Sequence, residues 1–338
     1  MILSYLIPRT GVFKLADNWK LIKKEMDLVE KKLNLIIEDA GPEIKMIGSY
    51  ILKGAGKRIR PALFLTAAQR PGVKITHMVD IAAAFELLHT ASLLHDDVID
   101  QAATRRGRET VHLRWTNKIA VLSGDYLLSQ VYRILVSCKN WPLMDLVVKM
   151  VQNLAEGEVE QAFAEYRSPD LEQKYFTWIG KKSASFFAGC CEAGSLMAGD
   201  SAKDQESWAA FGYHLGIAFQ LIDDLLDYRG KEFDTGKPLY GDLHNRVLTL
   251  PLIRTMQSNN QLSPELLSAY LGQYGENGEA CEQVVQVVLK GDGLDYTFSK
   301  AEEYATKAID FIEGLTGIEP EKKEALVLLP RSLLLRTK

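Results

Sequence analysis

Residues 85–100 read FELLHTASLLHDDVID, an apolar helical pattern that ends in three carboxylates. At about 3.6 residues per turn, Asp96 and Asp100 lie one above the other on a single helix face. His89 falls close to the same stripe, whereas Asp97 is turned away by about 100° and supports the pair from the side. Two carboxylates on one helix face predict a site for a hard cation that prefers oxygen ligands, usually Mg²⁺.

A second copy of this arrangement lies in FQLIDDLLDY, residues 219–228. Asp223 and Asp227 are again four residues apart, with Asp224 beside them and Gln220 about one turn earlier. A single cluster of this kind is explained most simply as the solvated end of a helix. Two copies inside apolar helices are costly unless a cation compensates their charge. We therefore expect two metal sites that face each other across a helical bundle.

The composition excludes a bulk nucleic-acid binder. The 338 residues are 47% hydrophobic and carry a net charge of −4, with Lys and Arg dispersed along the chain. No segment reaches the roughly 18 apolar residues of a membrane span, and the apolar start MILSYLIPR is too short for a signal peptide. The four cysteines contain no C-x-x-C pair, which favours buried reduced thiols and a cytoplasmic location.

The hydrophobic periodicity is helical almost throughout and shows no convincing strand. We expect an all-α fold, one large helical bundle that forms a single domain over residues 1–338, with an N-terminal helix within residues 1–40. The expected helices cover residues 20–39, 44–53, 62–69, a long helix from 76, 117–137, 142 to about 166, 168–199, 203–228 and 248–256. The loop 229–243, RGKEFDTGKPLYGDL, is rich in glycine and charge, and its length predicts a functional role.

A set of cations flanks the two acidic clusters. Each alone is explained as a solvated surface charge, but together they predict a site that binds anions, because Arg in particular matches phosphate with two hydrogen bonds. The inferred chemistry is a diphosphate bridged by Mg²⁺ to the two clusters, with a second anion pocket nearby. The set comprises Lys57, Arg60, Arg105, Arg106, Lys182 and Lys237.

From about residue 54 to 253 the chain resembles the trans-polyprenyl diphosphate synthases. The family's two Asp-Asp-x-x-Asp motifs are present as DDVID at 96–100 and DDLLD at 223–227. The surrounding matches are GKRIRP at 56–61, RRG at 105–107, GDY at 124–126, FQ at 219–220 and GKP at 236–238. The resemblance implies an isoprenoid synthase bundle around a deep cavity, and head-to-tail condensation of isopentenyl diphosphate with an allylic diphosphate.

The resemblance also implies a role for each matching residue. Asp96 and Asp100 would bind Mg²⁺ that holds the allylic diphosphate, and Asp223 would bind a further ion, with Asp97, Asp224 and Asp227 completing two metal sites that hold three ions once substrate is bound. Arg105, Lys182 and Lys237 would contact the same diphosphate, and Lys182 joins Asp96, Asp100 and Asp223 as a catalytic residue. Isopentenyl diphosphate would be held by Lys57, Arg60, His89 and Arg106. Ser183 stands where the family usually has Thr, and Gln220 keeps its family identity.

The assembly implied by the resemblance is a homodimer or a heterodimer with a small subunit. The chain is expected to touch a membrane only at the periphery, through its apolar product, which is a precursor of quinone side chains.

One position departs from the family pattern. The family often reads Arg-Glu-Gly-Lys before Thr-Leu-Pro-Leu, whereas this chain has His-Asn-Arg-Val at 244–247. Val247 therefore replaces a lysine, and Arg246 is the neighbouring residue able to supply the charge. The departure affects a local diphosphate contact and leaves the reaction class unchanged.

The residues that precede Asp96 predict a long product. Ala91 and Ser92 are small, where short-chain members of the family commonly place aromatic side chains as a floor. The next bulky residues are Leu88 and Phe85, the latter roughly 16 Å below Asp96 at 1.5 Å per residue. Placing Tyr at position 91 is therefore expected to shorten the product.

Several alternatives compete with this interpretation. A farnesyl or geranylgeranyl diphosphate synthase would make a shorter product, and a subunit of a heteromeric synthase would need a partner for activity. A non-catalytic subunit tends to lose the aspartate clusters, both of which are intact here. A terpene cyclase usually has Asn, Ser or Thr with Glu in its second motif, and a di-iron bundle needs two Glu-x-x-His pairs, of which only Glu86–His89 is present.

Overall fold

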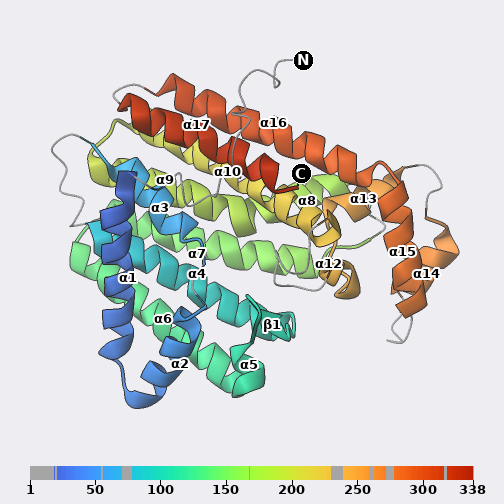
Figure 1. The fold of residues 1–338 in the computed structure, drawn as a ribbon, viewed down its shortest axis with the longest axis horizontal. Helices are drawn as coiled ribbons and strands as arrows, with labels where there is room; N and C mark the ends of the chain where they lie inside the picture. Colours follow the sequence, from blue (N-terminus) through green and yellow to red (C-terminus); the bar gives the residue numbers. More distant parts are fainter. Residues whose placement is uncertain are drawn as a thin grey trace.

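The computed structural model describes residues 19, 21–54, 56–70, 78–166, 168–229, 239–258, 262–271, 278–315 and 318–337. These parts are almost entirely helical (Figure 1), which confirms the all-α prediction. The helices are α1 (Lys23–Glu38), α2 (Pro42–Leu52), α3 (Ile59–Ala68), α4 (Val79–Ile99), α5 (Val111–Arg114), α6 (Asn117–Cys138), α7 (Trp141–Ala162), α8 (Leu171–Ile179), α9 (Ser185–Ala198), α10 (Ala202–Arg229), α12 (Gly241–His244), α13 (Leu250–Gln257), α14 (Pro264–Leu271), α15 (Gly278–Lys290), α16 (Gly293–Gly314) and α17 (Pro320–Leu334).

The prediction that the chain has no strand was wrong at one place. β1 (Thr104–Arg105) pairs antiparallel with β2 (Arg108–Glu109) directly after α4. The two loop residues, Arg106 and Gly107, have φ angles of 53° and 70°. Positive φ at both central residues is typical of the type I′ turn that joins two-residue hairpins. A hairpin this short has too few residues to show an alternating sequence pattern.

The long helices pack in a continuous series through the bundle. α6 packs on α4, α4 on α3, α3 on α9, α9 on α10, and α10 on α16. Figure 1 shows α16 and α17 lying along α10. Small residues permit the closest approaches: a Cβ at Gly194 would lie 2.4 Å from the carbonyl oxygen of Phe64, and one at Gly212 would lie 2.5 Å from that of Phe187.

The segment predicted as one helix over 168–199 is interrupted. Between α8 and α9 lies the π-helical turn η4 (Gly180–Ala184), which carries Lys182 and Ser183. Such turns shift the side chains that follow and often occur at functional sites. Gly157 of α7 packs against this turn, where an added Cβ would lie 2.8 Å from the backbone nitrogen of Lys182. The irregular turn is therefore fixed by a close contact with α7.

Two long helices begin at side-chain caps. Thr116 accepts a hydrogen bond from the Ile119 N–H at the start of α6, and Asn140 accepts one from the Leu143 N–H at the start of α7. Within the described residues, α6 is the one helix long and apolar enough to cross a membrane. The expectation that no segment has the length and composition of a membrane span was therefore wrong for α6. Its apolar window is 44% buried, and one side of the helix packs against α4 in the bundle.

Candidate active site

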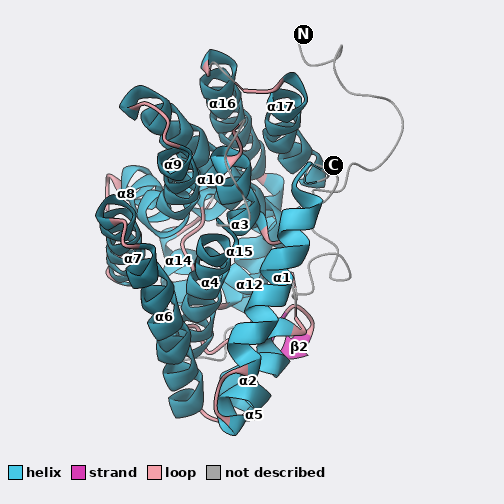
Figure 2. Ribbon diagram, turned by 90° about the vertical axis from the view of Figure 1, so that its left-hand side faces the viewer, coloured by secondary structure: helices cyan, strands magenta, loops and turns pink. Residues whose placement is uncertain are grey.

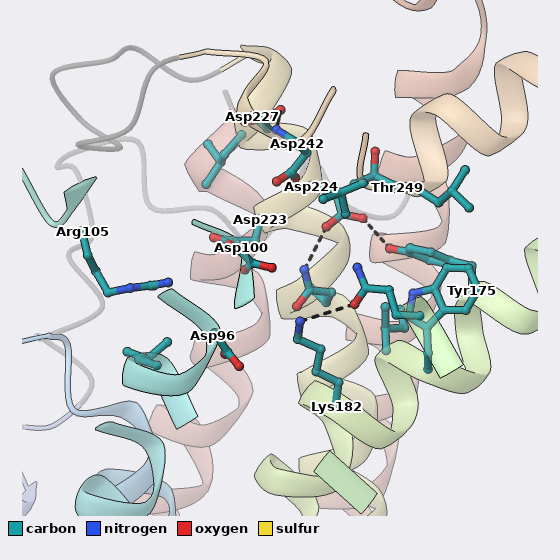
Figure 3. A pocket seen from close by; sticks show the side chains of 18 of the residues that line it. Asp96, Asp100, Arg105, Tyr175, Lys182, Asp223, Asp224, Asp227, Asp242 and Thr249 are labelled. Carbon is teal, nitrogen blue, oxygen red and sulfur yellow. Dashed lines mark hydrogen bonds between the residues drawn. The ribbon is translucent and has the colours of Figure 1, made fainter. Parts of the chain in front are cut away.

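Two acidic helix faces meet at one cavity inside the bundle (Figure 3). Asp96 and Asp100 project from the end of α4, and Asp223, Asp224 and Asp227 project from α10. These carboxylates line a space of about 400 Å³, which we call the acidic chamber. The expectation that the two clusters face each other across a bundle is confirmed.

A second space of about 590 Å³, the basic chamber, adjoins the first. Its lining contains most of the cations expected from the sequence, namely Lys57, Arg60, Arg105, Arg106 and Lys182, together with His89, Ser183 and Gln220. Asp96 and Asp223 line both chambers, so the two spaces meet at the aspartates. The structure thus brings an acidic and a basic compartment together at one place.

A chain of hydrogen bonds holds the second acidic cluster in position (Figure 3). The Ser183 hydroxyl donates to Gln220 Oε1 at 2.8 Å, and the Gln220 amide donates to Asp224 Oδ1 at 2.9 Å. The Tyr175 hydroxyl donates to the other oxygen of Asp224 at 2.5 Å. Burial, and then the charge of Asp242, raise the pKa of Asp224 to about 7. Asp224 is therefore committed to this network, and its neighbour Asp223 faces both chambers.

Asp227 organises the loop that follows α10. Its carboxylate accepts hydrogen bonds from the backbone N–H groups of Gly241 at 3.0 Å and Asp242 at 3.2 Å. These contacts close one side of the acidic chamber. Lys237 and the rest of its Gly-Lys-Pro motif lie outside the described residues, so its predicted diphosphate contact stays a prediction.

The aspartates of the first acidic cluster differ in their surroundings. Asp97 is buried and lies outside both chambers, beside a small pocket of about 70 Å³, where it accepts a hydrogen bond from Arg105 Nε at 2.6 Å. This agrees with its expected support of the Asp96–Asp100 pair. Burial, followed by the charge of Glu158, raises the pKa of Asp96 to about 7. A cation bound at Asp96 would relieve this unfavourable accumulation of negative charge.

Lys182 has a carboxylate partner that the sequence did not reveal. Its Nζ lies 2.6 Å from Glu158 Oε1 on α7 and donates to Gln161 at 3.3 Å. Burial lowers the pKa of Lys182, but Glu158 and Asp96 outweigh burial and raise it. Lys182 therefore stays charged at the edge of both chambers. Glu158 lies in an amphipathic pattern of α7 that carries no motif, so only the fold brings it to the site.

The β1–β2 hairpin orients two of the predicted arginines. Its type I′ turn directs Arg105 toward Asp97, while Arg106 Nη1 donates to the Gly54 carbonyl at 2.6 Å. This second contact places Arg106 against the glycine-containing loop before α3, where a Cβ at Gly56 would lie 2.3 Å from its guanidinium. Both arginines line the basic chamber, with Arg105 held by the Asp97 carboxylate and Arg106 by the Gly54 carbonyl.

Two of the basic groups that line the basic chamber are deeply buried. The Arg60 guanidinium lies 4.7 Å from the centre of the Phe186 ring, and burial lowers the pKa of Arg60. Burial, and then Arg60, lower the pKa of His89 well below its usual value, so this imidazole is neutral near pH 7. Neighbouring Arg58 instead forms an ion pair with Glu86 at 2.6 Å and belongs to the framework.

The walls below Asp96 differ from the sequence prediction. Ser92 lines the basic chamber, as expected, but Ala91 is fully buried and does not. Phe85 is not part of the chamber wall either; its ring packs 5.3 Å from that of Phe64 in the core. The expected tunnel down to Phe85 is therefore not part of this chamber, and the tunnel stays a prediction. The apolar part of the chamber wall includes Leu154, Phe186, Phe187 and Phe219.

Position 247, where the sequence departs from the family pattern, also lies at the site. Val247 lines the acidic chamber, whereas Arg246 is exposed and lines neither chamber. Arg246 accordingly does not replace the lysine within the described structure. Arg336, from the last helical turn of the chain, does line both chambers, and the sequence contained no motif that pointed to it.

The donor set fits a hard divalent cation. The acidic chamber offers carboxylate oxygens from two facing helices, the ligands that Mg²⁺ prefers. Among the described residues, no three His, Cys, Asp or Glu side chains come close enough to form a complete site by themselves. Because Mg²⁺ usually keeps water and substrate phosphate oxygens in its coordination shell, one or two carboxylates per ion are sufficient.

Comparisons with known proteins agree with this geometry. The family model described as Polyprenyl synthetase matches residues 42–288. Octaprenyl diphosphate synthase of Haemophilus influenzae is 34% identical, covering 92% of this chain and 93% of that protein. Heptaprenyl diphosphate synthase component 2 of Geobacillus stearothermophilus is 31% identical, covering 89% and 93%. A crystal structure of a polyprenyl synthase from Caulobacter crescentus, complexed with calcium and isoprenyl diphosphate, has a TM-score of 0.89 at 28% identity, covering 97% and 100%.

A bundle with two facing aspartate clusters and an adjoining cationic chamber defines a prenyltransferase that acts on diphosphates. The chain belongs to the polyprenyl synthetase family. The resemblance, the isoprenoid synthase fold and the reaction class expected from the sequence are confirmed. The names of the two relatives agree with the expected long-chain type.

Proposed function

We propose that this enzyme condenses isopentenyl diphosphate head-to-tail with an allylic diphosphate, in the presence of Mg²⁺, to give a long-chain all-trans polyprenyl diphosphate. The observation that carries the proposal is the meeting of Asp96 and Asp223 at the junction of the two chambers. The acidic chamber takes the allylic diphosphate and its metal ions. The basic chamber takes isopentenyl diphosphate, whose double bond then lies beside the allylic carbon.

The chain's own residues stabilise the departing diphosphate. Lys182 and Arg105 line the acidic chamber and supply hydrogen-bond donors to its oxygens, and Asp96, Asp100 and Asp223 are the metal ligands. When bound, Mg²⁺ supplies positive charge that stabilises the leaving diphosphate. Before substrate arrives, Glu158 holds Lys182 in place at 2.6 Å, so the lysine is already oriented.

Both charged and neutral hydrogen-bond donors hold the second substrate. Arg60 and Arg106 provide guanidinium groups, and neutral His89 adds an N–H donor without further repulsion among the cations. The allylic C–O bond breaks, the isopentenyl double bond forms the new C–C bond, and the proton lost from the adjacent carbon goes to the released diphosphate. This sequence needs no nucleophilic Ser or Cys. The apolar wall with Phe186, Phe187 and Phe219 excludes water from the reacting carbons.

One incubation tests this function. The purified chain alone receives Mg²⁺, farnesyl diphosphate and labelled isopentenyl diphosphate, and the products are sized after removal of the diphosphate. We expect a ladder that extends well beyond geranylgeranyl length. A product that stops at geranylgeranyl size would support the shorter-chain alternative, and no product at all from a folded chain would support dependence on a partner.

The proposal includes a homodimer. α6 lies at the outer edge of the bundle (Figure 2), and its outward face exposes Val121, Leu122, Tyr132 and Val136, the last of them 64% exposed. Such a row of apolar side chains fits a second copy of the same helix. Two relatives are named as component 2 of a heptaprenyl diphosphate synthase, which makes a heteromeric assembly the competing arrangement.

Light scattering distinguishes these assemblies. The wild-type chain alone is expected to have the mass of two copies, and Val136→Glu is expected to halve it. Met46→Glu, a substitution at an equally exposed apolar residue of α2, serves as the control and leaves the mass unchanged. A monomeric wild-type chain would contradict the homodimer. The cytoplasmic location stays part of the proposal and is supported by four free cysteines, three of them buried.

A further inference from the structure

Arg336 reaches the reaction chambers from the far end of the chain. It lies in η5 (Leu335–Thr337), the short 3₁₀ turn that follows α17, and this turn packs against α10. Because α10 carries the second aspartate cluster, the last turn of the protein is docked directly beside that cluster. Arg336 lines both the acidic and the basic chamber.

The described residues do not fully satisfy the guanidinium of Arg336. Its Nη1 is buried without a hydrogen-bond partner among the described residues. The side chain rests 5.8 Å from the Phe219 ring and faces Asp223 and Lys57, whose charges act on it in opposite directions. An unpaired buried cation is costly, and a second cation nearby increases that cost. An anion bound at Arg336 would remove this cost.

The other two cations of the acidic chamber are already engaged. Lys182 is paired with Glu158 at 2.6 Å, and Arg105 with Asp97 at 2.6 Å. Lys57 and Arg336 are the cations of this chamber for which the described residues provide no ion pair. They are therefore available to a ligand without first breaking a contact in the protein.

The chamber wall also lacks a cation where one is expected. Val247 occupies the lining position at which the resemblance noted in the sequence implies a lysine, and Arg246 is exposed and lines neither chamber. Val247 and Arg336 line the same chamber. The positive charge that position 247 lacks is thus present in the chamber, supplied from a segment nearly ninety residues later in the chain.

We propose that Arg336 binds the diphosphate of the allylic substrate and replaces the lysine that is missing at position 247. The inference rests on the proposed function, since it requires a diphosphate in the acidic chamber. The planar guanidinium matches phosphate oxygens with two parallel hydrogen bonds. The C-terminal turn thereby becomes part of the substrate site, and truncation before Arg336 removes a binding residue.

The test compares Arg336→Met, which keeps an unbranched aliphatic side chain, with Arg331→Met on the preceding helix α17, a residue that lines neither chamber. Kinetics give KM for farnesyl diphosphate and for isopentenyl diphosphate, and calorimetry with Mg²⁺ gives the Kd of inorganic pyrophosphate. We expect Arg336→Met to raise the KM for farnesyl diphosphate and the Kd of pyrophosphate by about 10-fold or more, since a charge-assisted contact is lost. The KM for isopentenyl diphosphate changes less, and Arg331→Met changes nothing.

A second set of variants places a positive charge at position 247. Val247→Lys added to Arg336→Met is expected to recover most of the lost pyrophosphate affinity, and Arg336→Lys to fall between wild type and Arg336→Met. Unchanged values in Arg336→Met, or a double variant no better than the single one, would overturn the proposal. If Arg336→Met melts early, Arg336→Lys and Arg336→Gln are compared in the same way. Pyrophosphate binding can be measured without turnover. If the wild type binds pyrophosphate but makes no polyprenyl product, the proposed function fails while this inference can still be tested.

Discussion

Single side chains decide how far the product can extend. Ser92 lines the basic chamber, whereas Ala91, its neighbour, is fully buried in the surrounding core. The helical twist explains the difference, since position 92 is about 40° from Asp96 around the helix axis and position 91 about 140°. The small side chain that faces the growing product is therefore that of Ser92.

Ser92→Tyr is expected to shorten the product. The phenol ring would project into the chamber and block the tail after fewer additions, so the ladder ends earlier while the first condensation persists. Chromatography of the dephosphorylated products measures this. Ala91→Tyr is the matched control. Its ring would overpack the core rather than enter the chamber, at a cost of about 1–3 kcal/mol of stability. A product ladder shortened by Tyr at position 91 and unchanged by Tyr at position 92 would contradict this assignment.

At the residue scale, the sequence predicted those site residues whose signal is local. The spacing of Asp96 with Asp100, and of Asp223 with Asp227, indicates which helix face they share before any fold is known. Glu158 and Arg336 were missed, because each reaches the chambers only through packing between distant segments. Asp97 and Asp224 show the limit of a motif, since their carboxylates also accept hydrogen bonds from Arg105 and Tyr175, and their predicted metal contacts stay predictions.

Among the elements, the π-turn between α8 and α9 positions Lys182 and Ser183. The sequence predicted one continuous helix there, because a π-turn differs from an α-helix by a single extra residue per turn and leaves the apolar pattern nearly intact. The other helices for which bounds were predicted end within a few residues of those bounds, since caps such as Asn140 and breakers such as Pro142 are visible in the sequence. No bounds were predicted for α14 to α17. Regular elements were thus predictable, and the irregular one at the site was not.

Gly157→Ala tests the contact that fixes this turn. The added Cβ would lie 2.8 Å from the Lys182 backbone nitrogen, so the turn must shift and Lys182 loses its alignment. We expect lower stability by roughly 1–3 kcal/mol and a lower kcat, measured by chemical denaturation and steady-state kinetics. Gly314→Ala, where nothing lies within 4 Å of the new Cβ, is the control. Equal behaviour of the two variants would show that the contact does not position Lys182.

α17 provides a test by pH. Lys322 is 4% exposed and donates to the Gln69 carbonyl at 2.6 Å. Burial, and then Arg70, lower its pKa from 10.5 to about 7. The unfolded chain therefore binds more protons than the folded chain between about pH 7 and the unfolded pKa, so the contribution of Lys322 to the free energy of unfolding rises with pH in that window, by at most about 1.4 kcal/mol per pH unit.

Lys322→Met removes this dependence. The free energy of unfolding of both proteins is measured by denaturation near pH 7 and near pH 9. The value for the wild type minus the value for the variant is expected to increase from the lower to the higher pH. Parallel pH profiles for the two proteins would mean that Lys322 keeps an ordinary pKa in the fold.

For the whole molecule, the bundle brings charges of opposite sign to one place inside an apolar core. Asp96 on α4 and Asp223 on α10 come from segments far apart in the chain, and the packing of α4, α3, α9 and α10 in series sets them across one cavity. The overall fold was predictable from periodicity and resemblance together. The place of Phe186, Phe187 and Phe219 in the wall of the basic chamber was not, since side-chain packing between helices carries no sequence period.

The most direct measurement of the central claim is Mg²⁺-dependent condensation of farnesyl diphosphate with labelled isopentenyl diphosphate by Asp96→Ala and by Asp223→Ala. Asp145→Ala, which removes an exposed carboxylate of α7, serves as the matched control. If facing aspartates hold the diphosphate through divalent ions, each site variant keeps its helical circular dichroism and loses turnover, while the control retains both. Near-wild-type product formation by either site variant would contradict the account.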